Sequence, residues 1–287
     1  MKKKRGKKTA KKDSGKIEKA GKKVRVKKNI KKVRGKKERA GKKKLRKKRK
    51  IKKKSVERVP TGISNFDSLI EGGFEKNSTN LIVGGSGSGK SIFSMQFLIE
   101  GVKKGEKCLY ITFEEKKEEF YKYMSEFGWD LYKLEKQGKF VFLEYTPEKV
   151  KTMLEEGGGI IESIVLRKKI KRIVIDSITS FELLFTEDLE KREAALALFN
   201  MLRKWDVTSL LTYEGDPFRD KKAASRTLEF EVDSIILLYF VRTKKERDRY
   251  IEILKMRGTK HSRRIYPLSI ENKGVVIGKQ PYTHLFD

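Results

Sequence analysis

From residue 79 onward, short apolar runs alternate with longer segments in which apolar residues recur every three or four positions. The apolar runs have the length of buried β-strands and lie at 79–83, 108–113, 139–144, 172–176 and 206–212. Helical spacing marks the segments between them, at 92–98, 116–127, 153–169 and 189–204, of which the third is interrupted by glycines at 157–159. Because strands that alternate with helices build parallel sheets, the pattern predicts an α/β fold with a mainly parallel sheet flanked by helices.

The pattern changes in the last fifth of the chain. Four apolar runs follow one another with short connections, at 231–241, 249–256, 264–270 and 274–277. Antiparallel strands can be joined by tight turns whereas parallel strands need a long crossover, so these runs predict an antiparallel C-terminal extension of the sheet. No apolar run approaches the ~18 residues of a transmembrane helix, so we expect no membrane insertion.

The first 54 residues differ in composition from the rest of the chain. They hold 32 of its 71 Lys and Arg side chains but only three of its 39 acidic side chains, and they contain no aromatic residue. Their few isolated apolar residues cannot offset the entropy lost on folding, and the like charges repel one another. We therefore expect a disordered Lys/Arg-rich tail at 1–54 and one nearly neutral folded domain at 55–287.

The charge of this tail indicates a polyanionic partner. Lysine and arginine bind the phosphates of DNA or RNA without reading the sequence, and the tail has no aromatic side chain to stack on bases. We favour nucleic-acid binding through residues 1–54; the alternatives are a solubilising tail without a specific partner and binding to an anionic membrane surface. The N-terminus lacks the apolar stretch of a signal peptide, and the single Cys108 forms no internal disulfide, so we expect a cytoplasmic location, nucleoid-associated if the tail binds DNA.

A glycine-rich segment follows the predicted strand at 79–83. It has the form G-x-x-x-x-G-K-[ST], and a helical pattern begins directly after it. Strand, loop and helix in this order are typical of a phosphate-binding P-loop, whose backbone N–H groups and helix N-terminus attract phosphate. We expect Lys90 to reach the β- and γ-phosphates of a nucleotide and Ser91 to bind Mg²⁺. The segment consists of Gly84, Gly85, Ser86, Gly87, Ser88, Gly89, Lys90 and Ser91.

Carboxylate side chains lie at the ends of two other predicted strands. Asp176 ends one of them, where it can hold Mg²⁺ through water. Glu114 and Glu115 follow the strand at 108–113, and a carboxylate at the carboxyl end of a parallel strand beside a P-loop can polarise the attacking water. The alternative is that these two acids only begin the next helix, where they favour the helix dipole.

Five segments of the domain occur in an order typical of one ATPase family. They are the lead-in at 59–67, the P-loop, Thr112–Glu115, the strand end at 175–179 and Leu254–His261. Together they resemble the KaiC branch of the RecA-type ATPases over roughly residues 55–280. The resemblance implies a RecA-like P-loop NTPase core, ATP as the nucleotide, and Glu114 and Glu115 as paired catalytic glutamates. The residues themselves contain no base-reading motif that separates ATP from GTP.

The same resemblance implies a ring or filament, hexamer-like, in which ATP lies between subunits. Lys255 and Arg257 would then reach the γ-phosphate in the neighbouring subunit, as an arginine finger does. Residues 242–264 carry ten Lys and Arg but three acids, which calls for an anion or an acidic neighbour; a solvated basic hairpin is the alternative. The family's clock members have two linked ATPase domains and a phosphorylated segment, whereas this chain is similar to its single-domain archaeal relatives, which argues against timekeeping.

The leading hypothesis is therefore an Mg²⁺-dependent ATPase that works as an oligomer in a regulatory or DNA-associated role. Two alternatives use the same motifs. One is a nucleotide-gated nucleic-acid-binding protein with negligible turnover, and the other is a signalling autokinase that phosphorylates its own Ser or Thr. The segment 215–226 corresponds to a DNA-binding loop of RecA-type recombinases, but it holds one aromatic residue, and we interpret it as an ordinary flexible loop.

Overall fold

The computed structural model describes residues 56–146, 148–149, 152, 159–218, 226–242 and 246–283. The chain divides into two units, Met1–Ser55 and Val56–Asp287, and the described residues belong to the second. The disorder and polyanion binding predicted for residues 1–54 lie outside the described residues and stay predictions. None of the helices in the described part of the chain is both long and apolar enough to span a bilayer.

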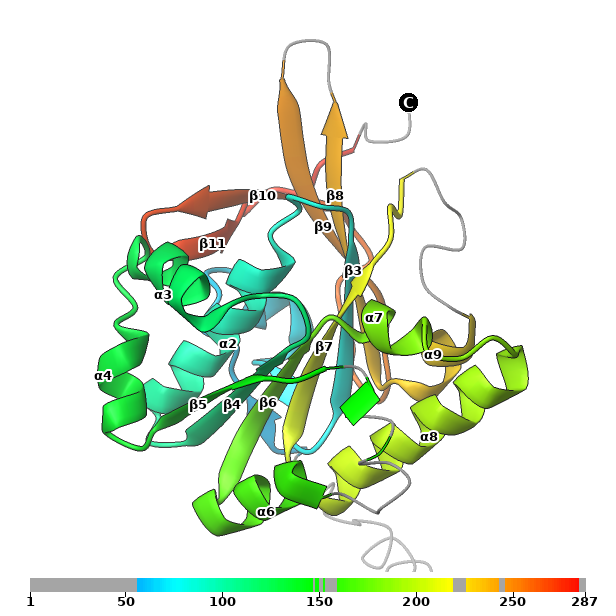
Figure 1. The fold of residues 1–287 in the computed structure, drawn as a ribbon. Coiled ribbons are helices and arrows are strands. Elements are labelled where there is room, and N and C mark those ends of the chain that lie inside the picture. Colours follow the sequence, from blue (N-terminus) through cyan, green and yellow to red (C-terminus); the bar gives the residue numbers. More distant parts are fainter. Residues whose placement is uncertain are drawn as a thin grey trace, which may run out of the picture. The chain divides into compact units, whose positions relative to one another are not determined.

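One large sheet runs through the described unit (Figure 1). Its strands are β3 (Thr79–Gly84), β4 (Lys107–Thr112), β5 (Phe140–Glu144), β6 (Ile170–Asp176), β7 (Thr208–Glu214), β8 (Ser234–Arg242), β9 (Arg247–Met256), β10 (Tyr266–Glu271) and β11 (Gly274–Ile277). They lie in the order β11-β10-β9-β8-β3-β7-β6-β4-β5. From β8 to β5 every neighbouring pair is parallel, and the pairs from β8 to β11 are antiparallel.

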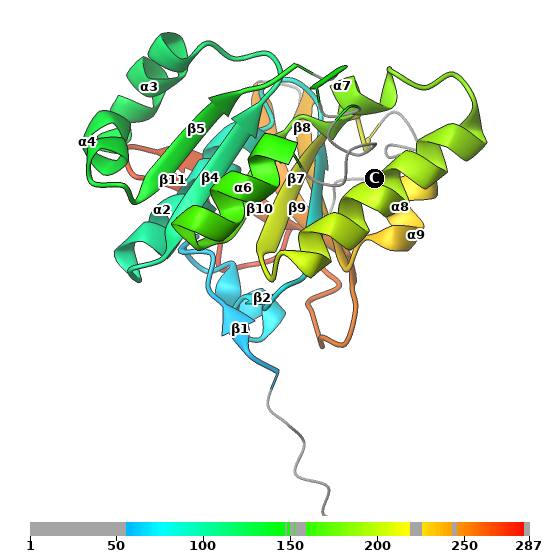
Figure 2. The ribbon, with the colours of Figure 1, turned by 60° about the horizontal axis from the view of Figure 1, so that its bottom comes forward.

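Helices cover both faces of this sheet (Figures 1 and 2). They are α2 (Lys90–Lys103), α3 (Lys117–Ser125), α4 (Leu131–Lys136), α6 (Gly159–Lys168), α7 (Ile178–Glu182), α8 (Asp188–Lys204) and α9 (Arg226–Glu231). The first three pack on one face and the last four on the other. Successive strand residues alternate between the two cores, because Ile82 faces α2 while Leu81 and Val83 face the opposite helices.

The predicted α/β fold with a mainly parallel sheet and an antiparallel C-terminal extension is confirmed. The four C-terminal runs correspond to β8–β11, and each neighbouring pair among these strands is antiparallel. β8 also pairs with β3 in parallel, with Asn80 opposite Ser234, and residues 226–231 form α9 before it. A helix before β8 provides the crossover that a parallel strand needs. The helix expected at 153–169 begins at Gly159, and residues 153–158 lie outside the described residues.

The segment that leads into β3 is fixed to the sheet from below (Figure 2). It contains β1 (Arg58–Val59), the short 3₁₀ helix η1 (Asp67–Ile70) and β2 (Phe74–Glu75), which pairs with β1. The guanidinium of Arg172, at the start of β6, is fully buried and donates to the carbonyl of Pro60 at 2.7 Å. It also donates to the carbonyl of Phe97 in α2 at 2.9 Å and to Glu106 at 2.5 Å. One side chain therefore joins the lead-in, α2 and β6.

Candidate active site

The glycine-rich segment forms a tight loop between β3 and α2. Gly84 must lack a side chain, since a Cβ there would lie 2.5 Å from Ser88 Oγ and 2.9 Å from the carbonyl of Leu238. Gly89, directly before α2, has a φ of 102°, which a residue with a side chain rarely adopts. The loop therefore leaves the backbone N–H groups at the N-terminus of α2 accessible, and such groups attract anions.

Lys90 is buried within this loop. Its ammonium donates to the carbonyls of Gly84 at 2.8 Å and Gly85 at 3.1 Å. Burial lowers the pKa of Lys90, and the opposite charge of Asp176 partly counteracts this. The loop thus holds the Lys90 ammonium beside the N-terminus of α2, and its contact with phosphate stays a prediction.

Asp176 lies at the carboxyl end of β6, beside the start of α2. Its Oδ2 accepts hydrogen bonds from Ser91 Oγ at 2.7 Å and from the Tyr110 hydroxyl at 2.5 Å, and its Oδ1 accepts one from Thr212 Oγ1 at 2.5 Å. The structure thus brings the two residues predicted to hold Mg²⁺ into direct contact. A hydroxyl and a carboxylate at this spacing are ligands that suit Mg²⁺, which prefers oxygen and keeps several waters and phosphate oxygens.

Glu114 and Glu115 follow β4 and precede α3. The hydroxyl of Thr112 accepts hydrogen bonds from both of their backbone N–H groups, at 3.2 and 3.0 Å, and thereby fixes the turn. Ser180 Oγ donates to Glu114 Oε1 at 2.6 Å. Burial raises the pKa of the Glu115 carboxyl, and the negative charges of Asp176 and Glu114 raise it further. Neither acid lies within the helix, because α3 begins at Lys117.

These residues line one cavity of about 460 Å³ at the carboxyl edge of the parallel strands. The cavity brings together the phosphate loop, the proposed metal ligands and both glutamates, and its lining includes Ser86, Gly87, Gly89, Lys90, Ser91, Glu114, Glu115 and Asp176. Parallel strands place their carboxyl ends at the same edge, which explains why segments far apart in sequence meet here. A lysine ammonium, a hydroxyl–carboxylate pair of the kind that suits Mg²⁺, and two glutamate carboxylates therefore face the same space.

Several residues at this site were not predicted. Arg249 on β9 lines the cavity, and its Nε donates to the carbonyl of Gly87 at 2.8 Å while its guanidinium lies 4.3 Å from the centre of the Phe240 ring. Tyr110 and Thr212 bond to Asp176 from inside their strands. Arg249 belongs to the basic stretch 242–264, but nothing in the sequence separates it from the other cations there. Buried strand residues such as Tyr110 give no sequence signal at all.

Lys255 and Arg257 do not lie at this cavity. They are at the end of β9 where Met256 pairs with Ser234, the first residue of β8, whereas the P-loop begins near Leu238, farther along β8. Lys255 Nζ donates to the carbonyls of Glu229 and Val232 at 2.7 and 2.8 Å.

Arg257 bonds to the end of α9 in the same way, and half of its side chain is exposed. It donates to the carbonyl of Phe230 and lies 3.6 Å from Asp233 Oδ1. Burial lowers the pKa of Lys255, and the neighbouring charge of Arg257 lowers it further. Within one chain, these two cations and the P-loop are therefore at opposite edges of the sheet.

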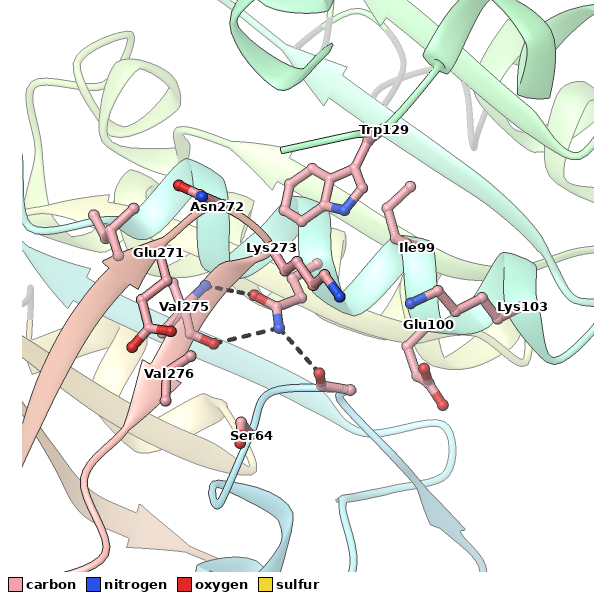
Figure 3. Close-up of a pocket in the computed structure, with 13 residues that line it drawn as sticks. Ser64, Ile99, Glu100, Lys103, Trp129, Glu271, Asn272, Lys273, Val275 and Val276 are labelled. Carbon is pink, nitrogen blue, oxygen red and sulfur yellow. Dashed lines mark hydrogen bonds between the residues drawn. The ribbon is translucent and has the colours of Figure 1, made fainter. Parts of the chain in front are cut away.

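A second and larger cavity, of about 800 Å³, lies beside α2 (Figure 3). The indole of Trp129 stands over it, and the amide of Gln96 fixes its wall by accepting from Val275 N at 2.7 Å and donating to the carbonyl of Gly62 at 3.0 Å. Ile270 lines this cavity as well as the P-loop cavity. The two spaces therefore adjoin at the end of β10.

Known proteins resemble both the sequence and the fold of this chain. The family model described as "ATPase: KaiC" matches residues 59–282. The circadian clock protein KaiC3 of Synechocystis is 35% identical over 230 residues, which are 77% of this chain and 46% of the relative. A UPF0273 protein of Thermotoga maritima is 34% identical over 236 residues, which are 77% of this chain and 96% of the relative.

A solved structure extends the similarity to three dimensions. The KaiC-like protein of the hyperthermophilic archaeon Pyrococcus horikoshii has a TM-score of 0.69 and 37% identity, and the match covers 78% of this chain and 99% of that one. The chain spans about half the length of the curated clock proteins it matches. It spans nearly the whole length of the UPF0273 proteins. The chain belongs to the KaiC family of P-loop ATPases, with a RecA-like fold.

Proposed function

We propose that this protein binds Mg²⁺-ATP and hydrolyses it, and that it works as an oligomer. The observation that carries the proposal is the single cavity onto which Lys90, Ser91, Asp176 and Glu114 converge. These are a phosphate-binding cation, a hydroxyl and a carboxylate for the metal, and a base for the attacking water. Phosphoryl transfer needs little covalent chemistry from the protein, so this set is what one subunit contributes to hydrolysis.

Each group has a defined task in this proposal. The N–H groups of the P-loop and the Lys90 ammonium bind the β- and γ-phosphates, and Ser91 holds the metal while Asp176 orients its water. Mg²⁺ supplies neutralisation of the charge that develops on the phosphate oxygens. Glu114 orients the attacking water and accepts its proton, and its hydrogen bond from Ser180 fixes the carboxylate. The adjoining cavity at Ile270 offers space for the remainder of the nucleotide.

We propose an oligomer because the cations of the family-like segment 254–261 do not line the P-loop cavity of their own chain. We propose that Lys255 and Arg257 of one subunit reach the γ-phosphate bound to the next. Their place at the opposite edge of the sheet supports this, because a cation there serves another copy of the chain more readily than its own P-loop. We further propose that residues 1–54 bind nucleic acid without sequence preference, by the electrostatics of their charge.

The experiment is ATP turnover per subunit at rising protein concentration, for the full chain and for a chain starting at Ser55, each with and without duplex DNA. We expect the rate per subunit to rise with concentration, and we expect DNA to stimulate only the chain that carries the tail. Lys90→Ala should abolish turnover with the fold intact, while Lys104→Ala, an exposed lysine that ends the same helix, should not.

Each part of the proposal has an outcome that contradicts it. A rate per subunit that is constant at every dilution contradicts the shared site. Turnover retained by Lys90→Ala contradicts hydrolysis at this cavity, and DNA binding that survives removal of the tail contradicts the role of residues 1–54. The nucleotide-gated binder predicts DNA binding with negligible turnover, whereas the autokinase predicts stable ³²P label on the protein.

A further inference from the structure

β4 carries a buried phenol next to the proposed metal site. Tyr110 is fully buried, and its ring packs at 4.6 Å on Phe120 and lies parallel to Phe142 at 5.7 Å. Its hydroxyl extends from this aromatic cluster to Asp176 Oδ2, at 2.5 Å. An apolar side chain would fill the same core position, so the hydroxyl has a purpose other than packing.

The carboxylate of Asp176 is held from three separate elements. Tyr110 in β4 and Ser91 in α2 donate to Oδ2, and Thr212 in β7 donates to Oδ1. Ser91 is itself a proposed metal ligand, whose oxygen would bind the metal while its O–H still donates to Asp176. Tyr110 and Thr212 are the two donors to this carboxylate that are not themselves proposed metal ligands.

We propose that Tyr110 is a positioning residue that fixes the orientation of Asp176 for Mg²⁺. The proposal rests on the proposed function, since it concerns the metal of that same site. A carboxylate that touches a metal or its water directs its lone pairs productively only when its rotation is restrained, and outer donors commonly supply this restraint. Tyr110 restrains Oδ2 from the buried side, and Thr212 restrains Oδ1 from the neighbouring strand.

The test is Tyr110→Phe in the full chain, which removes one oxygen and keeps the packed ring. The readouts are Mn²⁺ affinity in the presence of ADP, measured by electron paramagnetic resonance, and affinity for a fluorescent ADP analogue in EDTA. We expect Mn²⁺ to bind about tenfold more weakly while metal-free ADP binding stays unchanged, because only the metal-facing acid is affected. Thr212→Val should weaken Mn²⁺ binding by a similar factor.

The matched control is Tyr121→Phe. Tyr121 is equally buried and belongs to the same aromatic cluster, but its hydroxyl bonds to Glu135 at 3.3 Å. We expect this variant to bind Mn²⁺ and ADP as the wild type does.

Two results would overturn the proposal. One is wild-type Mn²⁺ affinity in Tyr110→Phe, and the other is an equal loss of metal-free ADP binding, which would mean that the phenol supports the loop rather than the acid. Failure of the proposed function looks different, because it appears in the wild type as Mn²⁺-ADP binding without ATP turnover. A wild type that binds no ADP would overturn both.

Discussion

The two edges of the parallel sheet use polar side chains in opposite ways. At the carboxyl edge, Ser91, Asp176 and Glu114 bond to other side chains and face a cavity. At the opposite edge, the buried Arg172 donates to backbone carbonyls of its own chain. Side chains that bond to one another around a space can rearrange when a ligand enters, whereas cations bound to backbone carbonyls hold elements together.

Arg257 combines features of both kinds of side chain. It bonds to the end of α9, like the structural cations, but half of its side chain is exposed. This difference from the fully buried Arg172 is what allows it to serve a neighbouring subunit in our proposal. Loss of Arg257 should therefore affect chemistry, and loss of Arg172 should affect stability.

The largest effect is expected from Arg257→Ala. If Arg257 acts as an arginine finger, turnover should fall by about a thousandfold. Nucleotide affinity should change much less, because the finger acts mainly on the transition state. Steady-state turnover and equilibrium nucleotide binding measure the two quantities, with the exposed Arg263→Ala as control.

Mixing two inactive variants tests whether the finger acts between subunits. Lys90→Ala keeps its finger and Arg257→Ala keeps its P-loop, so mixed oligomers should regain part of the turnover. A mixture as inactive as its components would mean that Arg257 does not act in trans.

The next effect concerns stability at the opposite edge. Arg172→Met should lower the free energy of unfolding by about 3 kcal/mol, because it leaves the carbonyls of Pro60 and Phe97 without their buried donor. Urea denaturation measures this. Lys171→Met, on the adjacent exposed position, should change stability by roughly 0.5 kcal/mol or less. Equal effects of both substitutions would remove the distinction between the two edges.

At the cavity, Glu114→Gln should lower turnover by about a hundredfold, since the amide cannot accept the proton of the attacking water. Thermal unfolding of the nucleotide-free protein should stay close to that of the wild type. Glu118→Gln, at the exposed first turn of α3, is the matched control. Wild-type turnover in Glu114→Gln would assign the base to another residue and leave Glu114 as a helix-start acid.

The smallest effect is expected from Glu115→Gln. The raised pKa of Glu115 means that folding disfavours its charged form, so the neutral amide should stabilise the nucleotide-free protein near pH 7. Solvent screening of this half-exposed group limits the gain to roughly 0.5 kcal/mol. The gain should vanish as the pH falls through the pKa of the carboxyl, where the wild type is protonated too. A gain that persists at low pH would exclude the electrostatic cause.

The sequence by itself determined the features that depend on neighbouring residues. The P-loop, the apolar strand that ends in Asp176 and the glutamates after β4 are each a contiguous pattern, and contiguous patterns fix local conformation and strand ends. The alternation of strand and helix was also enough for the α/β fold. Because parallel strands bring their carboxyl ends to one edge, the meeting of these groups could be predicted too.

Only the tertiary structure decided how strands order and which buried groups touch. It placed β8 in parallel beside β3, with α9 as the crossover, so that β8 joins the parallel sheet to the antiparallel extension. It brought Tyr110 to Asp176 and Arg249 to Gly87, pairs separated by 66 and 162 positions. Such contacts depend on strand order and on the packing of both faces at once, and no local pattern encodes them. The residues of the candidate site could therefore be predicted from the sequence, whereas the buried groups that contact them depend on long-range packing.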